Sequence, residues 1–506
     1  MDTKKTIETI KSCLIVVLSL SAVLLLYFFW ENLSLKNLRW EWNSGKEQVA
    51  VPVEKPGIPQ VILPAEVQIH LADELYTVIL PEDYDVWQLG SSALAKFSKG
   101  EGSGAEEISE EKYREVMSDR SLQIKFNYAV PFEGFCRQFS VSYSRYGSIR
   151  NMTVLAYSDA TPESLFVHDG ANDRYYRLVG PAAETAVFAQ VLDAVEQDGT
   201  YSPYYPASSY LGVNNSEAVL PVFLERTLTR VTSVRNLAGE ERDEASDVLA
   251  RTFFGDNLDF VRRLEDSNGT ITYMYDYGQR VLTVDKLGVA LYKEELAEAT
   301  ATTGFYGSLD AAIDFVANHG GWYPKCEELR LEERGLTPFL WSGREIQSGN
   351  RNGWRFSFGY RRGNEVFYND AGAAIVVEVF DGQITYYHRN VFDSILVRGM
   401  VSSLWEAKDS ANTIAQNTDW IYETLLAEGV FTEEEESDQK TTGPHLLTDE
   451  QRFDRIGEAV QRVQEGYILS SGKAQAERCW VIQIKGVLFF FELFSGEPMG
   501  YTVVGR

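Results

Sequence analysis

The first feature of the sequence is an apolar run near its start. Residues 13–30 read CLIVVLSLSAVLLLYFFW, with no charged side chain. A helix of this length is about 27 Å long, close to the ~30 Å hydrocarbon core of a bilayer. A cleaved signal peptide is the alternative, but bulky residues 27–30 stand where its small-residue cleavage site should be. An uncleaved transmembrane helix is therefore favoured.

The run has a short charged tail before it and a long chain after it. Basic residues flank the run almost equally, so the positive-inside rule does not decide its orientation. The tail is assigned to the cytoplasm because a short tail followed at once by an apolar span is the layout of a signal anchor. The rest of the chain is then expected outside the cell membrane. The expected parts are a tail (1–12), a transmembrane helix (13–30), a tether (31–60), an exported α+β domain (61–202), a central helix–sheet unit (203–300), a second unit (301–395) and a C-terminal unit (396–506).

The patterning of residues 61–202 mixes two periods. Alternating apolar and polar residues predict strands within 67–80 and 124–128, whereas 182–196 is patterned as a helix. Residues 99–110 (KGEGSGAEEISE) are polar and predict a loop. Residues 169–173 (DGAND) lack the alternating acidic pattern of a calcium loop and predict a hairpin turn.

Two distant segments share one pattern. Residues 376–387 read VVEVFDGQITYY and residues 490–501 read FFELFSGEPMGY, so that Gly382 matches Gly496. Each predicts two strands joined by a turn in which Gly takes a positive φ. A helix ending in Gly precedes each, with apolar stripes at 309–316 and 453–463, and the second opens at a Thr448–Gln451 capping box. These regions are expected to be repeats.

A looser third copy lies upstream. Residues 243–254 are patterned as a helix, and 270–275, 280–284 and 289–292 as strands. Asn268-Gly269 supplies a turn between strands. The fold class expected is therefore α+β, with antiparallel sheets and helices in repeated units.

The composition narrows the function. The chain has 47 Lys and Arg against 74 Asp and Glu, a net charge of −27, which argues against nucleic acid as a partner. Beyond the membrane, Cys136, Cys326 and Cys479 allow at most one disulfide, whose formation the sequence leaves open.

Motifs for catalysis, cofactors or metals are not found. The five histidines, His70, His168, His319, His388 and His445, are far apart in sequence and are interpreted as structural. Residues 466–473 (GYILSSGK) have the wrong spacing for a phosphate loop. Ser470 and Lys473 have Ser–Lys spacing but are expected in a turn between strands rather than on one helical turn. We therefore predict a protein without catalytic, cofactor-binding or metal-binding residues.

Residues 249–292 carry a more specific resemblance. The Phe253-Phe254 pair, residues 261–263, Tyr273, residues 278–280 and residues 288–292 resemble the central motif of the YycH regulatory proteins of Gram-positive bacteria. Residues 479–482 and 496–498 also resemble this family and a PepSY-like fold. The resemblance implies a non-enzymatic regulator that associates with a YycI-type membrane protein and a WalK-type sensor histidine kinase, which controls cell-wall homeostasis. Family members are understood to act largely through their transmembrane helices.

One face of the predicted span is a candidate contact. Ile15, Ser19, Ala22 and Leu26 share this face, and Ser19 with Ala22 forms its small patch. This face either packs against a partner helix or meets membrane lipid. The alternative function is an anchored extracytoplasmic sensor or protease-inhibitor-like PepSY protein that binds a peptide or wall fragment.

Overall fold

The computed structural model describes residues 55–503, with gaps at 82, 101–103, 200, 222–224, 235–239, 299–302, 323–338, 363–364, 370–371, 392–393, 433–446 and 470–475. The predicted transmembrane helix, at 13–30, lies outside the described residues. Within them the chain forms helices and mainly antiparallel sheets, which confirms the α+β class.

The first part of the described chain is built on a nine-stranded sheet of order β3-β7-β6-β5-β4-β1-β2-β8-β9. Its strands are β1 (Glu66–Ala72), β2 (Leu75–Ile79), β3 (Gly104–Ile108), β4 (Ser121–Pro131), β5 (Asn151–Ser158), β6 (Ser164–Asp169), β7 (Arg174–Val179), β8 (Tyr204–Pro206) and β9 (Val219–Pro221). The strands predicted within 67–80 and 124–128 are confirmed as β1, β2 and part of β4. The loop predicted over 99–110 is wrong in part, because residues 104–108 pair with β7 along the edge of the sheet.

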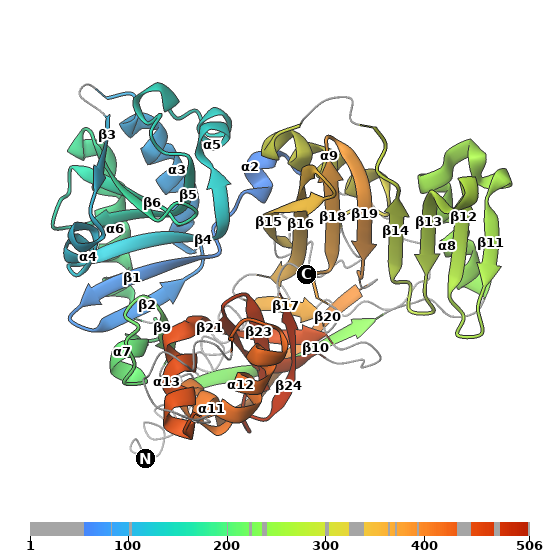
Figure 1. The fold of residues 1–506 in the computed structure, drawn as a ribbon. Coiled ribbons are helices and arrows are strands. Elements are labelled where there is room, and N and C mark those ends of the chain that lie inside the picture. The colour runs from blue at the N-terminus through green and yellow to red at the C-terminus, as the bar shows by residue number, and fades with distance from the viewer. Residues whose placement is uncertain are drawn as a thin grey trace, which may run out of the picture. The chain divides into compact units, whose positions relative to one another are not determined.

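Apart from the short helix that precedes β1, the helices of this part connect the strands of the sheet and cover it (Figure 1). They are α2 (Ile58–Val61), η2 (Asp83–Asp85), α3 (Val86–Phe97), α4 (Glu110–Met117), α5 (Phe132–Gln138), η3 (Tyr143–Arg145), α6 (Ala182–Asp198) and α7 (Ala207–Tyr210). The predicted helix over 182–196 is confirmed as α6, which ends at Gly199 in the left-handed region with φ of 62°. Phe188, Leu192 and Val195 form its buried stripe.

A second, thirteen-stranded sheet runs through the rest of the chain, in the order β11-β12-β13-β14-β19-β18-β16-β17-β21-β22-β23-β24, with β15 paired to β16. Its strands are β11 (Arg262–Glu265), β12 (Ile271–Tyr275), β13 (Arg280–Val284), β14 (Ala290–Glu294), β15 (Phe339–Ser348), β16 (Arg351–Arg362), β17 (Glu365–Asn369), β18 (Ile375–Phe380), β19 (Gln383–Arg389), β21 (Val460–Leu469), β22 (Glu477–Ile484), β23 (Val487–Glu492) and β24 (Pro498–Val503). β10 (Glu225–Val234) and β20 (Ser394–Glu406) form a separate two-stranded sheet.

The central unit agrees with its sequence pattern except for its first strand, at 262–265, which the pattern did not predict. It consists of α8 (Glu240–Phe254), η4 (Gly255–Phe260), η5 (Asp276–Gly278) and strands β11–β14. Gly269 has φ of 81° in the turn predicted from Asn268-Gly269. Phe253, Tyr273 and Tyr292, which belong to the resembling motif, are buried in the core. The motif thus coincides with one helix–sheet unit.

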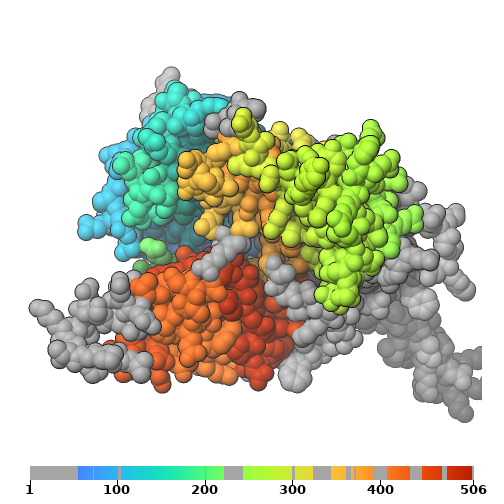
Figure 2. Space-filling model, turned by 45° about the vertical axis from the view of Figure 1, so that its right-hand side comes forward, coloured from blue at the N-terminus to red at the C-terminus, as the bar shows by residue number. Residues whose placement is uncertain are grey.

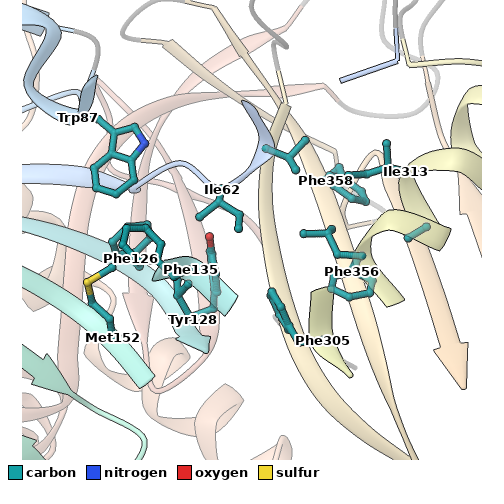
Figure 3. Close-up of a cluster of buried hydrophobic side chains, with 14 of the residues drawn as sticks. Ile62, Trp87, Phe126, Tyr128, Phe135, Met152, Phe305, Ile313, Phe356 and Phe358 are labelled. Atoms are coloured by element: carbon teal, nitrogen blue, oxygen red, sulfur yellow. The ribbon is translucent and has the colours of Figure 1, made fainter. Parts of the chain in front are cut away.

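The second unit places α9 (Phe305–Asn318) against the strands β16, β18 and β19. Leu309, Ala312, Ile313 and Val316 are fully buried, so the predicted stripe is confirmed. Figure 3 shows Phe305, Phe356 and Phe358 in the same apolar cluster as Trp87 and Phe126 of the first part. A continuous core therefore links the first sheet with the second unit.

The C-terminal unit corrects one prediction. α13 (Asp449–Ala459) opens with the predicted Thr448–Gln451 capping box but ends at Ala459. The helical stripe predicted to reach Val463 and Gly466 is wrong there, because 460–469 form β21 and pair with β22. The β-branched residues Val460 and Val463 fit this paired surface. The remaining helices are α11 (Ser410–Gln416) and α12 (Thr418–Ala427).

Candidate functional site

The four residues of the predicted membrane face, Ile15, Ser19, Ala22 and Leu26, lie outside the described residues. Their role therefore stays a prediction. In the portion of the chain that the structure describes, no helix is both long and apolar enough to cross a bilayer.

Three of the described histidines, His70, His168 and His319, stack on aromatic rings, and both described cysteines are buried. Nδ1 of His70 lies 2.9 Å from the carbonyl oxygen of Asp119, and His70 stacks on Tyr76. Cys136 and Cys479 are buried free thiols, and burial raises the pKa of Cys136 to about 12. Cys326 and His445 lie outside the described residues. Across the described ranges, no group of three His, Cys, Asp or Glu side chains is placed to hold a metal.

Two other candidates from the sequence are the turn at 169–173 and the pair Ser470 and Lys473. Asp169, at the end of β6, accepts hydrogen bonds from the backbone of Asn172 in the turn to β7 and from that of Asn151 at the start of β5, and the pairing of β6 with β7 confirms the hairpin turn. Ser470 and Lys473 lie outside the described residues, although the strands β21 and β22 on either side of them pair antiparallel.

The described chain contains a cavity of about 370 Å³ between the first sheet and the C-terminal strands. Three pieces of backbone form its walls. β4 and the start of β1 form one wall, the turn between β6 and β7 forms another, and β21 with β22 forms the third. The cavity therefore lies where segments far apart in sequence meet.

A β-bulge shapes the wall from β4. Lys125 pairs with Val154 of β5, and Val130 pairs with Met152, so residues 126–129 face only Thr153. Phe126 and Tyr128 turn into the apolar core (Figure 3), whereas Asn127 is exposed. The bulge thus gives the cavity an apolar base and a polar entrance.

A second bulge lies in β21. Val460 pairs with Ile484 and Arg462 pairs with Gln483, which leaves Gln461 as the additional residue. The Gln461 side-chain oxygen accepts a hydrogen bond from the backbone of Gly486 at 3.2 Å. Bulges redirect side chains and are frequent beside binding sites, and here two of them border one cavity.

The charges of the cavity are unequal. Arg462 Nε lies 2.7 Å from Glu66 Oε2, and both side chains are mostly buried. Lys125 Nζ donates a hydrogen bond to Gln68 Oε1, and burial lowers the pKa of this half-buried amine. Glu217 also acts on Lys125, but it already pairs with Arg114 at 3.1 Å. Two cations therefore share the single lining carboxylate of Glu66.

A different feature is the exposed turn between β12 and β13. Asp276, Tyr277 and Gly278 all have positive φ, at 48°, 55° and 94°, and the Tyr277 side chain is fully exposed. Phe260 is 79% exposed just before β11, and the pairing of Arg262 with Met274 places it at the same end of the sheet. Residues of this unit form a broad exposed surface in Figure 2. We call Phe260 and Tyr277 the aromatic tip.

Sequence reasoning missed the cavity. Lys125 and Arg462 are 337 positions apart by their numbers, and each stands alone in an ordinary strand pattern. Neither bulge carries a glycine at its inserted residues, so the sequence gives no local signal for them. The turn of the aromatic tip could have been predicted, because Tyr277 belongs to an Asp-Tyr-Gly sequence inside residues 249–292.

Three solved structures match the chain at low sequence identity. The solved structure of YycH from Bacillus subtilis matches over 89% of this chain and 99% of its own, with a TM-score of 0.49 and 12% identity. An uncharacterized protein from Eubacterium rectale matches over 57% of this chain and 92% of its own, with a TM-score of 0.29 and 11% identity. The C-terminal domain of YpeB from Bacillus megaterium matches over 53% and 99%, with a TM-score of 0.26 and 10% identity.

Comparison of the sequence gave no relative. No protein-family model and no curated protein sequence matches the chain.

Proposed function

We propose that this chain is a non-enzymatic, membrane-anchored regulator of a WalK-type sensor histidine kinase, which acts with a YycI-type sister protein in cell-wall homeostasis. The observation that carries the proposal is the resemblance of residues 249–292 to the YycH central motif. This stretch forms most of one folded unit, from the end of α8 through β14, so the resemblance follows a structural boundary.

The contact with these partners is proposed to have two parts. Inside the membrane it uses the face of Ile15, Ser19, Ala22 and Leu26, because small residues allow helices in lipid to approach closely. Outside the membrane it uses the aromatic tip. Exposed aromatic side chains are frequent anchors of protein contacts, and a tyrosine with positive φ is kept at a cost in backbone energy.

The test is co-purification of the full-length chain with the kinase from detergent-solubilised membranes. Ser19→Leu with Ala22→Leu keeps the span apolar but fills the small patch, so kinase recovery is expected to fall at least tenfold. Val17→Leu with Ser21→Leu adds bulk to the opposite helix face and serves as the matched control. Equal recovery with both double variants, at equal membrane levels, would remove the membrane face from the proposal.

The cavity favours a second function, that of an extracytoplasmic ligand sensor. Its walls come from the first sheet and the C-terminal unit, so a ligand there would contact both at once. The two functions are compatible, because a regulator of a sensor kinase can itself receive a chemical signal.

A further inference from the structure

We propose that the cavity between β4 and β21 binds a small ligand that carries a carboxylate and amide groups, of the size of a short peptide. This inference deepens the second function, that of a ligand sensor, and does not depend on the kinase.

The first step is the charge of the site. Arg462 and Lys125 line the cavity together with Glu66, which already pairs with Arg462 at 2.7 Å. Lys125 lies opposite Glu66 in the β1–β4 pair, but its ammonium donates its hydrogen bond to the neutral amide of Gln68, which does not offset the cost of burying a charge as a carboxylate would. A ligand carboxylate would supply the missing negative charge, whereas a ligand cation would be repelled. The site is thus selective for anions although the chain as a whole carries a net charge of −27.

The second step is the hydrogen-bonding capacity of the walls. Within the part of the chain that the structure describes, the side-chain amides of Asn127 and Gln483 line the cavity without a hydrogen-bond partner. The bulge also leaves residues 126–129 without paired partners on β5 beyond Thr153. Amide and backbone groups of this kind match the alternating donors and acceptors of a peptide.

The third step is size and shape. A volume of about 370 Å³ lies at the lower end of the range for small-molecule sites, which favours a ligand of a few residues over a folded partner. Ala129 and the turn residues Gly170 and Ala171 line the cavity with little side-chain bulk. Their small size keeps the entrance open beside the two cations.

The test uses N-acetyl-dialanine as the probe, with N-acetyl-dialanine amide as its uncharged counterpart. Both are titrated calorimetrically into the full chain, purified in detergent. The wild type is expected to bind the acid at least tenfold more tightly than the amide. Lys125→Met is expected to weaken binding of the acid at least tenfold. Lys112→Met, an exposed lysine of α4 paired with Glu115 at 2.8 Å, should leave it unchanged.

A second variant keeps the test decisive if Lys125→Met does not fold. Ala171 is exposed in the turn between β6 and β7, so Ala171→Trp should block the cavity without disturbing the core. Each variant is first shown to unfold cooperatively at a temperature close to that of wild type, and if Lys125→Met fails this check, Ala171→Trp decides. The proposal is overturned if the acid does not bind, if acid and amide bind equally, or if the folded variants bind like wild type. Kinase co-purification is measured separately, so failure here leaves the proposed regulatory function standing.

Discussion

The second unit and the C-terminal unit carry the same sequence pattern but differ in the turn of the matched hairpin and in the helix that covers it. In the second unit, Asp381 and Gly382 form a two-residue turn between β18 and β19, with φ of 50° and 82°. In the C-terminal unit, β23 and β24 are joined by residues 493–497, and Glu492 Oε2 accepts hydrogen bonds from the backbone of Phe494 and Ser495. The matched glycines therefore lie in turns of different length.

The helices differ as well. α9 packs directly on the β18–β19 hairpin, whereas Trp420 of α12 makes the ring contacts with Phe489, Phe491 and Tyr501 in the C-terminal unit. α13, which the pattern matched to α9, packs on α12. The comparison teaches that the repeated pattern in this chain preserves a hairpin, but neither the length of its turn nor the helix that covers it.

The strongest test of this comparison removes one covering side chain from each unit. Ile313 of α9 and Ile421 of α12 are both fully buried. Ile313→Ala and Ile421→Ala are each expected to destabilise the protein by about 2–5 kcal/mol, because each leaves a cavity. Chemical denaturation measures the loss. A loss below about 1 kcal/mol for Ile421→Ala would mean that α12 does not cover its sheet as described.

The next test compares the two glycines. Gly382 and Gly496 both have positive φ, so an alanine at either position is expected to cost about 1–2 kcal/mol. A Cβ at Gly496 would also lie 2.8 Å from Lys408 Cδ, whereas at Gly382 the nearest atom, of Thr303, is 3.5 Å away. Gly496→Ala should therefore cost more than Gly382→Ala, as measured by thermal unfolding. The reverse order would contradict the turn geometry.

The helix starts offer a smaller effect. Thr448 accepts a hydrogen bond from Gln451 N at 3.2 Å and so caps α13, whereas α9 starts at Gly304 without a side-chain cap. Thr448→Ala is expected to cost about 1 kcal/mol, and Gly304→Ser to gain a few tenths. Hydrogen exchange of the first turn of each helix reports these changes. Unchanged exchange in α13 after Thr448→Ala would argue against the capping box.

The smallest effect is a pH dependence placed in the second unit. His319 stacks on Phe315 and contacts Phe253, and burial lowers its pKa from the usual 6.5. Because the unfolded chain then binds the proton more tightly, the stability from neutral His319 is present above pH 6.5 and is lost as the pH falls below it.

His319→Phe should flatten the loss of stability between about pH 7 and 5 in hydrogen exchange of α9. His168 in the first sheet also has a pKa lowered by burial, so His168→Phe is the matched control. It should change the pH dependence of the first sheet and leave α9 as in wild type. An unaltered profile for α9 in His319→Phe would rule out this histidine as its source.

Much of the fold could be predicted from local patterns. In the central unit, β12, β13 and β14 were predicted but β11 was not, because β12 and β13 alternate clearly and Asn268-Gly269 marks the turn before β12, whereas the four residues of β11 are all exposed. The boundary between α13 and β21 was not, since Val460 and Val463 satisfy a helical stripe as well as a strand. Tertiary pairing with β22 decided between the two readings.

The cavity could not be predicted, for a physical reason. Its charge imbalance exists only because β1, β4 and β21 bring Glu66, Lys125 and Arg462 together in the folded chain. The spacing of these residues in the sequence does not predict that contact. The turn of the aromatic tip was partly predictable, because Asp276 and Gly278 are residues that favour turns.

The central claim is regulation of a sensor kinase, and the most direct measurement is kinase autophosphorylation in proteoliposomes. The WalK-type kinase is reconstituted alone, with the wild-type chain, and with the Ser19→Leu, Ala22→Leu chain at equal membrane levels. The account predicts that the wild-type chain changes the autophosphorylation rate severalfold. With the double variant, the rate is expected to equal that of the kinase reconstituted without the chain. An identical rate in all three preparations, with both chains inserted, would contradict it.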